Sequence, residues 1–226
     1  MAIISNLDLI RRVPLFALLP PEQEQLVADT VVKKRFKRAE AIVKQGDTSA
    51  ALYIVLSGRA RVIMSNEMGR EVILARLGAG DCIGEMSLID GEPHSATVSA
   101  DGQLDVLVLG RQAFLHCLND SSVFADAVMR SLVRRLRSAD HKIESLALLD
   151  VYGRVARTLI EMASRNDDEQ LVIADKVSRQ DIAKTVGASR EMVSRVMKVF
   201  SESGHIEELA DGRVLLHDHL MGHGPW

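Results

Sequence analysis

The chain has 226 residues, 47% of them hydrophobic, and a formal net charge of −3 at pH 7. This length favours two domains with real cores, and the slightly acidic balance excludes a protein that coats nucleic acid through its overall charge. No stretch approaches the roughly 18 consecutive apolar residues of a membrane span, and residues 1–6 do not resemble a signal peptide, so we expect a cytoplasmic protein that makes no membrane contact.

The first half of the chain is expected to form an all-β roll preceded by short helices. Residues 7–32 have a helical character, and short β-rich runs separated by turn residues follow between residues 41 and 109. Nine of the 15 glycines lie between Gly46 and Gly110. Such a density of turns is typical of a compact barrel or roll.

Residues 80–96, GDCIGEMSLIDGEPHSA, join two strands of the expected roll. If residues 84–88 make a helical turn, its free N–H groups can receive a phosphate together with the Ser95 hydroxyl and the Ala96 amide. Glu85 then lies where it can accept hydrogen bonds from ribose hydroxyls. The same glycine-rich pattern also occurs as plain turn chemistry, so taken alone it is a weak indication of a nucleotide site.

Residues 121–152 contain no glycine or proline and predict one long amphipathic helix. At about 1.5 Å per residue it extends over more than about 40 Å, too far to be covered by a small roll along its whole length. The apolar stripe is therefore expected to pair with a second copy in a parallel homodimer, the alternative being a helix packed wholly within its own chain. The predicted dimer residues are Phe124, Val128, Leu132, Leu136, Ala139, Ile143 and Leu146.

Residues 178–204 predict two short helices joined by a tight turn. Ser178 and Ser189 are N-cap residues, Gly187 interrupts the pair and Gly204 ends it. Each helix has an apolar face to bury, and the start of the second helix carries donors and acceptors on its outer face, as a helix in the DNA major groove does. A merely solvated charged face is the alternative. The predicted DNA-contacting residues are Ser178, Arg179, Ser189, Arg190, Glu191, Ser194, Arg195 and Lys198.

The charge around this motif differs from that of the whole chain. From Lys176 to Lys198 there are six basic residues against two acidic ones, which supplies the local patch that DNA binding needs. After it, two β-rich runs flank Asp211-Gly212, a preferred hairpin dipeptide, so residues 151–226 are expected to form a winged helix.

No Ser-His-Asp, Cys-His or metal-ligand spacing is present, so we expect neither an enzyme nor a metal site. Cys82 and Cys117 are too few and too far apart for a zinc or iron–sulfur site made by cysteine alone, and are expected to be small core residues. The tail histidines His217, His219 and His223 are interpreted as part of a flexible polar end.

Three motifs together resemble the CRP/FNR family of bacterial transcription regulators over nearly the whole chain: GDCIGEMSLIDGEPHSATV, RRLRSADHKIESLALLDVYGRVARTL and SRQDIAKTVGASREMVSRVMK. The resemblance implies an α+β fold: an N-terminal cyclic-nucleotide-binding β-roll (jelly roll) at 1–120, a long dimerisation helix and hinge at 121–150, and a winged helix-turn-helix at 151–226. It implies that a ligand alters the pairing of the long helices and so moves the two reading helices to about 34 Å apart, one DNA turn.

By resemblance, Glu85 stands at the ribose, Gly84 and Ser87 frame the phosphate turn, and Ser95 with the Ala96 amide stands at the phosphate. The ligand-binding residues implied are Gly84, Glu85, Met86, Ser87, His94, Ser95, Ala96, Ala139 and Asp140.

Three positions depart from the cyclic-AMP-binding members. His94 stands where those members have a phosphate-clamping arginine, and neutral histidine cannot donate two parallel hydrogen bonds to a phosphate. Ala139 and Asp140 stand where they have a threonine and a serine at the adenine, and an aspartate pairs better with guanine N1 and N2. No obligatory cofactor is expected, and the effector is left open between cyclic AMP, cyclic GMP, cyclic di-GMP and none.

The reading helix combines features of two branches of the family. Arg190, Glu191 and Arg195 match the base-contacting residues of the cyclic AMP receptor branch, and Ser194 matches a serine of the FNR and FixK branch. The resemblance implies a palindromic operator with TGTGA-like half-sites, or TTGAT-like ones if Ser194 contacts a thymine. RNA polymerase is the further partner implied. A ligand-independent regulator of the same family with a degenerate pocket is the alternative function.

Overall fold

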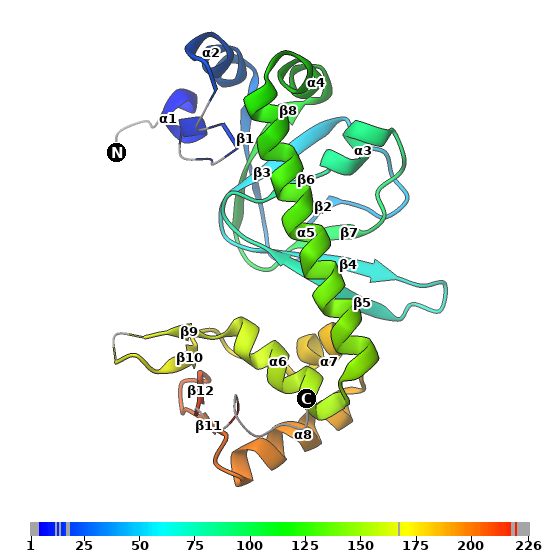
Figure 1. Cartoon of the computed structure of the whole chain (residues 1–226), viewed down its shortest axis with the longest axis vertical. Coiled ribbons are helices and arrows are strands. Elements are labelled where there is room, and N and C mark those ends of the chain that lie inside the picture. The colour runs from blue at the N-terminus through cyan, green and yellow to red at the C-terminus, as the bar shows by residue number, and fades with distance from the viewer. Residues whose placement is uncertain are drawn as a thin grey trace. The chain divides into compact units, whose positions relative to one another are not determined.

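The computed structural model describes residues 5–11, 13, 15–16, 19–166, 168–217 and 220. The chain forms two compact units, Met1–Leu136 and Arg137–Trp226 (Figure 1). The boundary between them falls inside one long helix, α5 (Ser122–Leu148), which therefore contributes to both units.

The first unit is a β-roll with helices at its N- and C-terminal ends, as expected. One antiparallel sheet has the order β1-β8-β3-β6 and the other β2-β7-β4-β5, and a core formed by residues of both sheets lies between them. Its elements before α5 are α1 (Asn6–Arg11), α2 (Pro21–Thr30), β1 (Val32–Phe36), β2 (Ala41–Val43), β3 (Ala51–Ser57), β4 (Ala60–Ser65), β5 (Glu71–Leu77), β6 (Cys82–Ile83), α3 (Glu85–Asp90), β7 (Thr97–Ala100), β8 (Leu104–Gly110) and α4 (Arg111–Asp120). Strand β1 and helix α4 are additions to the predicted pattern.

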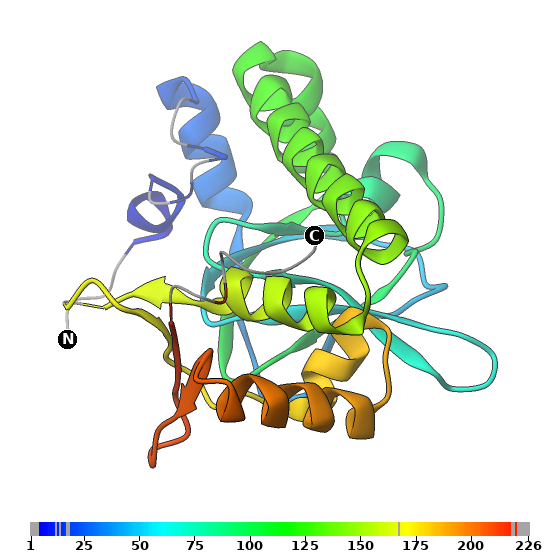
Figure 2. The same ribbon diagram turned by 60° about the horizontal axis from the view of Figure 1, so that its bottom comes forward.

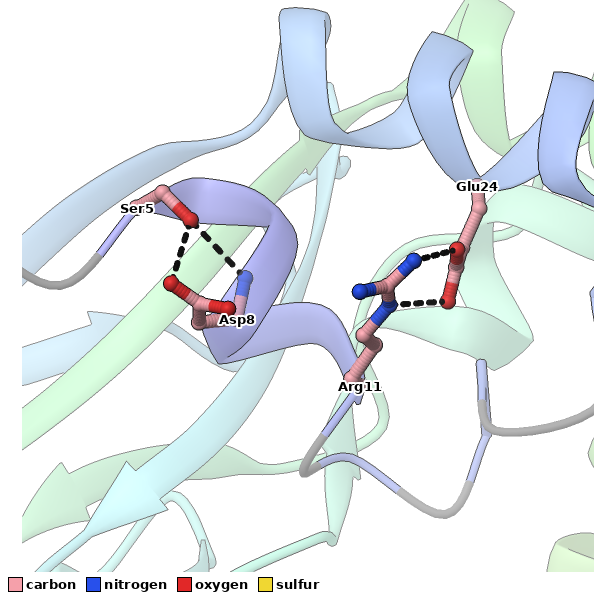
Figure 3. Close-up of polar contacts among 4 residues, drawn as sticks. All are labelled: Ser5, Asp8, Arg11 and Glu24. Carbon is pink, nitrogen blue, oxygen red and sulfur yellow. Dashed lines mark hydrogen bonds and ion pairs between the residues drawn. The ribbon is translucent and has the colours of Figure 1, made fainter.

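The two N-terminal helices are joined by a surface ion pair (Figure 3). Arg11 at the end of α1 donates through Nε and Nη2 to the two carboxylate oxygens of Glu24 in α2, at 3.0 and 2.9 Å. At the start of α1 the Ser5 hydroxyl accepts from the Asp8 amide at 3.2 Å, so the helix begins with a side-chain cap.

Strand β1 lies at the edge of its sheet and carries a row of cations. Arg35 donates through Nε to Asp105 of the neighbouring strand β8 at 2.6 Å, and Lys33 lies 3.5 Å from the same carboxylate. Lys34 lies on the other side of the strand, with Nζ 4.7 Å from the centre of the Phe36 ring. A single buried carboxylate thus faces two of the three cations.

The start of α5 is part of the core of the first unit. Phe124 and Val128 are only 0% and 4% exposed, and the Phe124 ring lies 5.9 Å from the rings of both Phe16 and Phe114. Leu132 is half-buried against the same core. Phe124 and Val128 therefore do not face a second chain, and their assignment to the dimer stripe is wrong.

The reason is the rotation of the apolar positions around the helix. Each residue of an α-helix turns about 100°, so twelve residues from Phe124 to Leu136 end about 120° away from the starting face. Leu136 is 62% exposed and Ile143 64% exposed. The apolar pattern that reads as one stripe is thus a buried face followed by an exposed one.

The second unit is a helix-turn-helix with a small sheet of order β11-β12-β10-β9 (Figure 2). Besides the C-terminal turns of α5, its elements are α6 (Val151–Met162), β9 (Ser164–Arg165), β10 (Leu171–Ile173), α7 (Arg179–Val186), α8 (Arg190–Glu202), β11 (Ile206–Glu208) and β12 (Val214–Leu216). Helices α6, α7 and α8 pack around one apolar core. The expected winged hairpin is β11-β12, with Gly212 in its turn at φ 88°.

Two boundaries in this unit differ from the prediction. The helix expected to run to residue 152 ends at Leu148, because Asp150 is extended and its side chain accepts from the Gly153 amide at 2.8 Å, which starts α6. The expected loop at 165–169 begins with the short strand β9, which pairs with β10.

Candidate functional site

The reading helix α8 is held in place by caps that the sequence predicts. The Ser178 hydroxyl accepts from the Asp181 amide at 3.2 Å, and the Ser189 hydroxyl accepts from the Met192 amide at 3.1 Å. Gly187 between the two helices adopts φ 67°, the left-handed conformation that glycine tolerates without strain. These contacts fix where α8 begins and how it leaves the turn.

One face of α8 is buried and the opposite face is polar and exposed. Val193, Val196, Met197 and Phe200 pack into the core of the second unit. The exposed side chains of the same helix include all five of its predicted DNA-contacting residues, Arg190, Glu191, Ser194, Arg195 and Lys198. This arrangement presents donors and acceptors along the N-terminal turns of a rigid helix, which is the geometry required in a major groove.

Glu191 is an ionised hydrogen-bond acceptor on this surface. Its own backbone N–H and the Ser189 hydroxyl lower the pKa of its carboxyl group. An acceptor-only side chain beside arginines can discriminate cytosine N4 from the other groups of the major groove.

Arg179, at the start of α7, pairs with Glu208 of the strand β11. Its side chain is 25% exposed. The ion pair joins the first helix of the motif to the wing, so a phosphate contact by Arg179 requires it to share its guanidinium with Glu208.

A second candidate site is a cavity of about 170 Å³ in the first unit. Seven of the predicted ligand-binding residues line it: Gly84, Glu85, Met86, Ser87, His94, Ser95 and Ala96. We call it the effector cavity. The helical turn that the sequence predicts at its wall is the short helix α3, which Gly84 precedes at φ 92°. A Cβ atom on Gly84 would lie 3.0 Å from Ser49 Oγ and 3.1 Å from the Ala51 carbonyl oxygen, so only glycine fits there.

Glu85 is buried in the wall of the effector cavity with one oxygen unpartnered. Its side chain is 5% exposed, and Arg135 of α5 donates through Nη1 to Oε1. The other oxygen, Oε2, is buried without a hydrogen-bond partner. Burial raises the pKa of Glu85 and Arg135 opposes the rise. A buried acceptor with free capacity fits a ligand that brings hydroxyl donors.

Arg135 also lines the effector cavity and is absent from the predicted site. It lies in the RRLR run of the long helix, at a position that the predicted apolar stripe leaves out. The approach of α5 to α3, 50 residues earlier in the chain, is what brings it to Glu85. Nothing in the local pattern around Arg135 predicts that contact.

The other predicted residues of the cavity differ in accessibility. Ser87 is buried, and its hydroxyl accepts from the Ser49 amide at 3.2 Å, which holds the facing loop. His94 is half-buried, and burial lowers its pKa, so the imidazole is neutral at pH 7. Ser95 is exposed beside it. Ala139 and Asp140 are exposed on the part of α5 that belongs to the second unit, and their role at a ligand stays a prediction.

Cys82 and Cys117 are buried core residues, as expected. Within the described residues, no group of three or more histidine, cysteine or carboxylate side chains is placed to hold a metal ion. His219 and His223 lie outside the described residues, and His217 lies at the end of the wing. No described helix is both long and apolar enough to cross a membrane.

Comparisons with known proteins identify both units. Residues 33–121 match the cyclic nucleotide-binding domain family, and residues 153–219 match the Crp-like helix-turn-helix domain family. A cyclic AMP receptor protein from Thermus thermophilus is 33% identical over 201 residues, which cover 89% of this chain and 91% of that protein. A CRP-like cAMP-activated global transcriptional regulator from Mycobacterium tuberculosis is 27% identical over 93% of this chain and 95% of that protein. Among solved structures, the c-di-GMP-responsive global regulator CLP of Xanthomonas campestris aligns with a TM-score of 0.74 and 26% identity, covering 88% of this chain and 99% of that one.

Proposed function

The chain belongs to the CRP/FNR family of transcription regulators, and we propose that it binds a two-fold symmetric DNA operator as a homodimer under the control of a cyclic nucleotide. The observation that carries the proposal is α8, whose buried face fixes the helix and whose exposed face presents Arg190, Glu191 and Arg195 together. The relatives that match over most of the chain are transcription regulators, and the role proposed here is likewise regulatory, with no catalytic step.

The homodimer is supported by an exposed apolar row on α5. Met129, Val133, Leu136 and Ile143 are 49–64% exposed and follow each other at steps of four, three and seven residues. Such heptad spacing is the pattern by which two parallel helices bury each other's apolar side chains. Ala139 and Leu146, also predicted for the dimer, are exposed on the same helix and flank this row.

The cyclic nucleotide is supported by the chemistry of the effector cavity. Glu85 Oε2 has free acceptor capacity for ribose hydroxyls. Ser95, the Ala96 amide and the N–H groups that begin α3 would receive the cyclic phosphate, with Arg135 as the cation that lines the cavity. Cyclic AMP, cyclic GMP and cyclic di-GMP each contain a ribose and a phosphate, and relatives are named for responses to cyclic AMP and to cyclic di-GMP.

A ligand-independent regulator is the second candidate, and the charge of the same cavity favours it. Asp90 and Glu92 line the effector cavity with Glu85, His94 is neutral, and Arg135 is already paired with Glu85. An anionic cyclic phosphate meets more negative than positive charge there, which weakens its binding.

For the operator, we propose TGTGA-like half-sites, in which Arg190 and Arg195 bind guanines and Glu191 accepts from cytosine. Ser194 lies on the same exposed face, and a thymine contact by it would favour TTGAT-like half-sites instead. RNA polymerase is the proposed further partner, and the cytoplasm, where bacterial DNA lies, is the proposed compartment.

The test combines ligand binding with DNA binding. A thermal-shift panel of the three cyclic nucleotides is expected to show stabilisation by one of them, and operator affinity measured at stated salt is expected to rise with that nucleotide. No thermal shift, with tight operator binding retained, selects the ligand-independent candidate. A binding-site selection that returns a motif without a two-fold repeat overturns the homodimer.

A further inference from the structure

One arginine in the second unit joins three helices. Arg154, in the first turns of α6, donates through Nη1 to the Leu149 carbonyl oxygen at 2.9 Å and through Nε to the Val186 carbonyl oxygen at 3.0 Å. Leu149 directly follows the last residue of α5, and Val186 is the last residue of α7. The side chain is half-buried, and both of these hydrogen bonds are partly shielded from water.

Both acceptors lie at the C-terminal ends of helices. The last four carbonyl groups of a helix have no partner within it, and the negative end of the helix dipole favours a cation there. A guanidinium presents donors in a rigid fork and can serve two carbonyls at fixed positions, whereas a lysine ammonium is a single point charge. Arg154 therefore caps α5 and α7 at once.

Further contacts hold the same junction. The Asp150 side chain caps α6 through the Gly153 amide at 2.8 Å, and Arg157 of α6 lies 3.3 Å from Glu144 of α5. Leu146 of α5 approaches the turn of the helix-turn-helix, since its Cδ2 lies 4.0 Å from the position of a Cβ on Gly187. The short segment between α5 and α6 is thus tied on both sides, and a free hinge at that point would have to break several of these contacts.

We propose that Arg154 is a positioning residue that fixes the last turns of α5 to the helix-turn-helix, so that α5 sets the orientation of the reading helix α8. Arg154 acts through the Leu149 and Val186 carbonyls and does not itself touch DNA. The consequence for the operator rests on the proposed homodimer: two reading helices rigidly carried by a paired α5 tolerate only one distance between half-sites.

The experiment compares the wild-type full chain with the variants Arg154→Gln and Arg154→Lys and with the control Arg165→Gln. Arg165 also donates to a backbone carbonyl, that of Glu169, at 2.6 Å, but in the β9-β10 loop. Operator affinity is measured with the selected half-site spacing and with one base pair added or removed. The wild type and Arg165→Gln are expected to lose about tenfold in affinity for the altered spacings, because one base pair rotates a half-site out of register. Arg154→Gln is expected to lose less than about threefold, because its reading helices are no longer fixed to α5.

A second readout needs no DNA. Amide hydrogen exchange in Arg154→Gln is expected to accelerate about tenfold at Leu149 and Ala188 together, with unchanged rates in β10 and β12, because the capped helix ends open locally. Arg154→Lys, which retains a charge but not the fork, is expected to be intermediate in both measurements. If Arg154→Gln fails to fold, the comparison of Arg154→Lys with the wild type provides the test.

The outcomes distinguish failure of the proposed homodimer from failure of the positioning role of Arg154. A wild type that binds a single half-site as tightly as two overturns the homodimer and leaves the exchange measurement to decide on Arg154. The positioning role is overturned if Arg154→Gln and Arg154→Lys discriminate between spacings as the wild type does and amide exchange at Leu149 and Ala188 is unchanged.

Discussion

Replacing Phe124 by alanine tests the division of α5 into a buried and an exposed face. Phe124 has no exposed surface and contacts two other phenylalanine rings at 5.9 Å. A Phe→Ala change at such a site costs about 3–5 kcal/mol, since it removes the buried ring and leaves a cavity. With a urea dependence of about 2 kcal/mol per molar, the unfolding midpoint of the first unit should fall by about 2 M.

Leu136→Ala, on the exposed face of the same helix, is the matched comparison. Leu136 is 62% exposed, so its truncation should change the stability of the monomer by less than about 0.5 kcal/mol. Urea unfolding followed by far-ultraviolet circular dichroism, at a low and a high protein concentration, separates the two faces. The fall in the unfolding midpoint caused by Phe124→Ala should be the same at both protein concentrations. A fall caused by Leu136→Ala should appear only at the high protein concentration.

Two results would refute this reasoning. A midpoint shift below about 0.5 M for Phe124→Ala means that the ring is not packed in a core. A shift that grows with protein concentration means that Phe124 contributes to an interface between chains. Phe124→Leu, expected to lose about 1 kcal/mol, provides the measurement if the alanine variant does not fold.

Four further experiments test the sites. Gly84→Ala should destabilise the first unit by about 1–2 kcal/mol in urea unfolding, because the left-handed backbone is strained for alanine and the methyl group would displace Ser49 Oγ, 3.0 Å away. Nucleotide binding in calorimetry should weaken with it, and wild-type affinity would contradict the proposed cavity. Burial raises the pKa of Glu85 above its ordinary 4.5, so the folded chain binds this proton more tightly than the unfolded chain does. The free energy of unfolding therefore falls as the pH rises above 4.5. Glu85→Gln should flatten that part of the stability profile, and an unchanged slope would show that another group causes it. Burial raises the pKa of Cys82 to about 12, so a thiol reagent at pH 8 should label it only after unfolding, and rapid native-state labelling would disprove its burial. Ser189→Ala removes the cap of α8 and should cost about 1 kcal/mol in thermal unfolding, with Ser203→Ala, near the other end of the helix, as the comparison.

The local features of the helix-turn-helix could be predicted because their causes are local. A serine cap bonds an amide three residues away, and a left-handed turn requires a glycine at one position, so Ser178, Ser189 and Gly187 can be read without knowledge of the fold. The β-roll is predictable for the same reason, from strands separated by turn residues.

Features that depend on distant segments could not be predicted. The contact of Arg135 with Glu85 joins residues 50 positions apart and depends on how α5 crosses the roll. Periodicity alone also cannot tell an apolar face that packs inward, as at Phe124, from one that stays exposed, as at Leu136. The end of α5 carries no sequence signal of this kind, because no glycine or proline marks it and Asp150 instead begins α6.

The charged edge of the roll restricts how this protein can assemble. An exposed edge strand offers unpaired backbone groups to any other strand, which is a route to fibres and precipitates. On β1, a second copy of the same strand would bring Lys33, Lys34 and Arg35 against their own counterparts, with a single carboxylate, Asp105, beside each set. Sheet extension is therefore electrostatically opposed at low salt. Pairing through β1 is thus disfavoured, and the charges of this edge do not oppose association through α5.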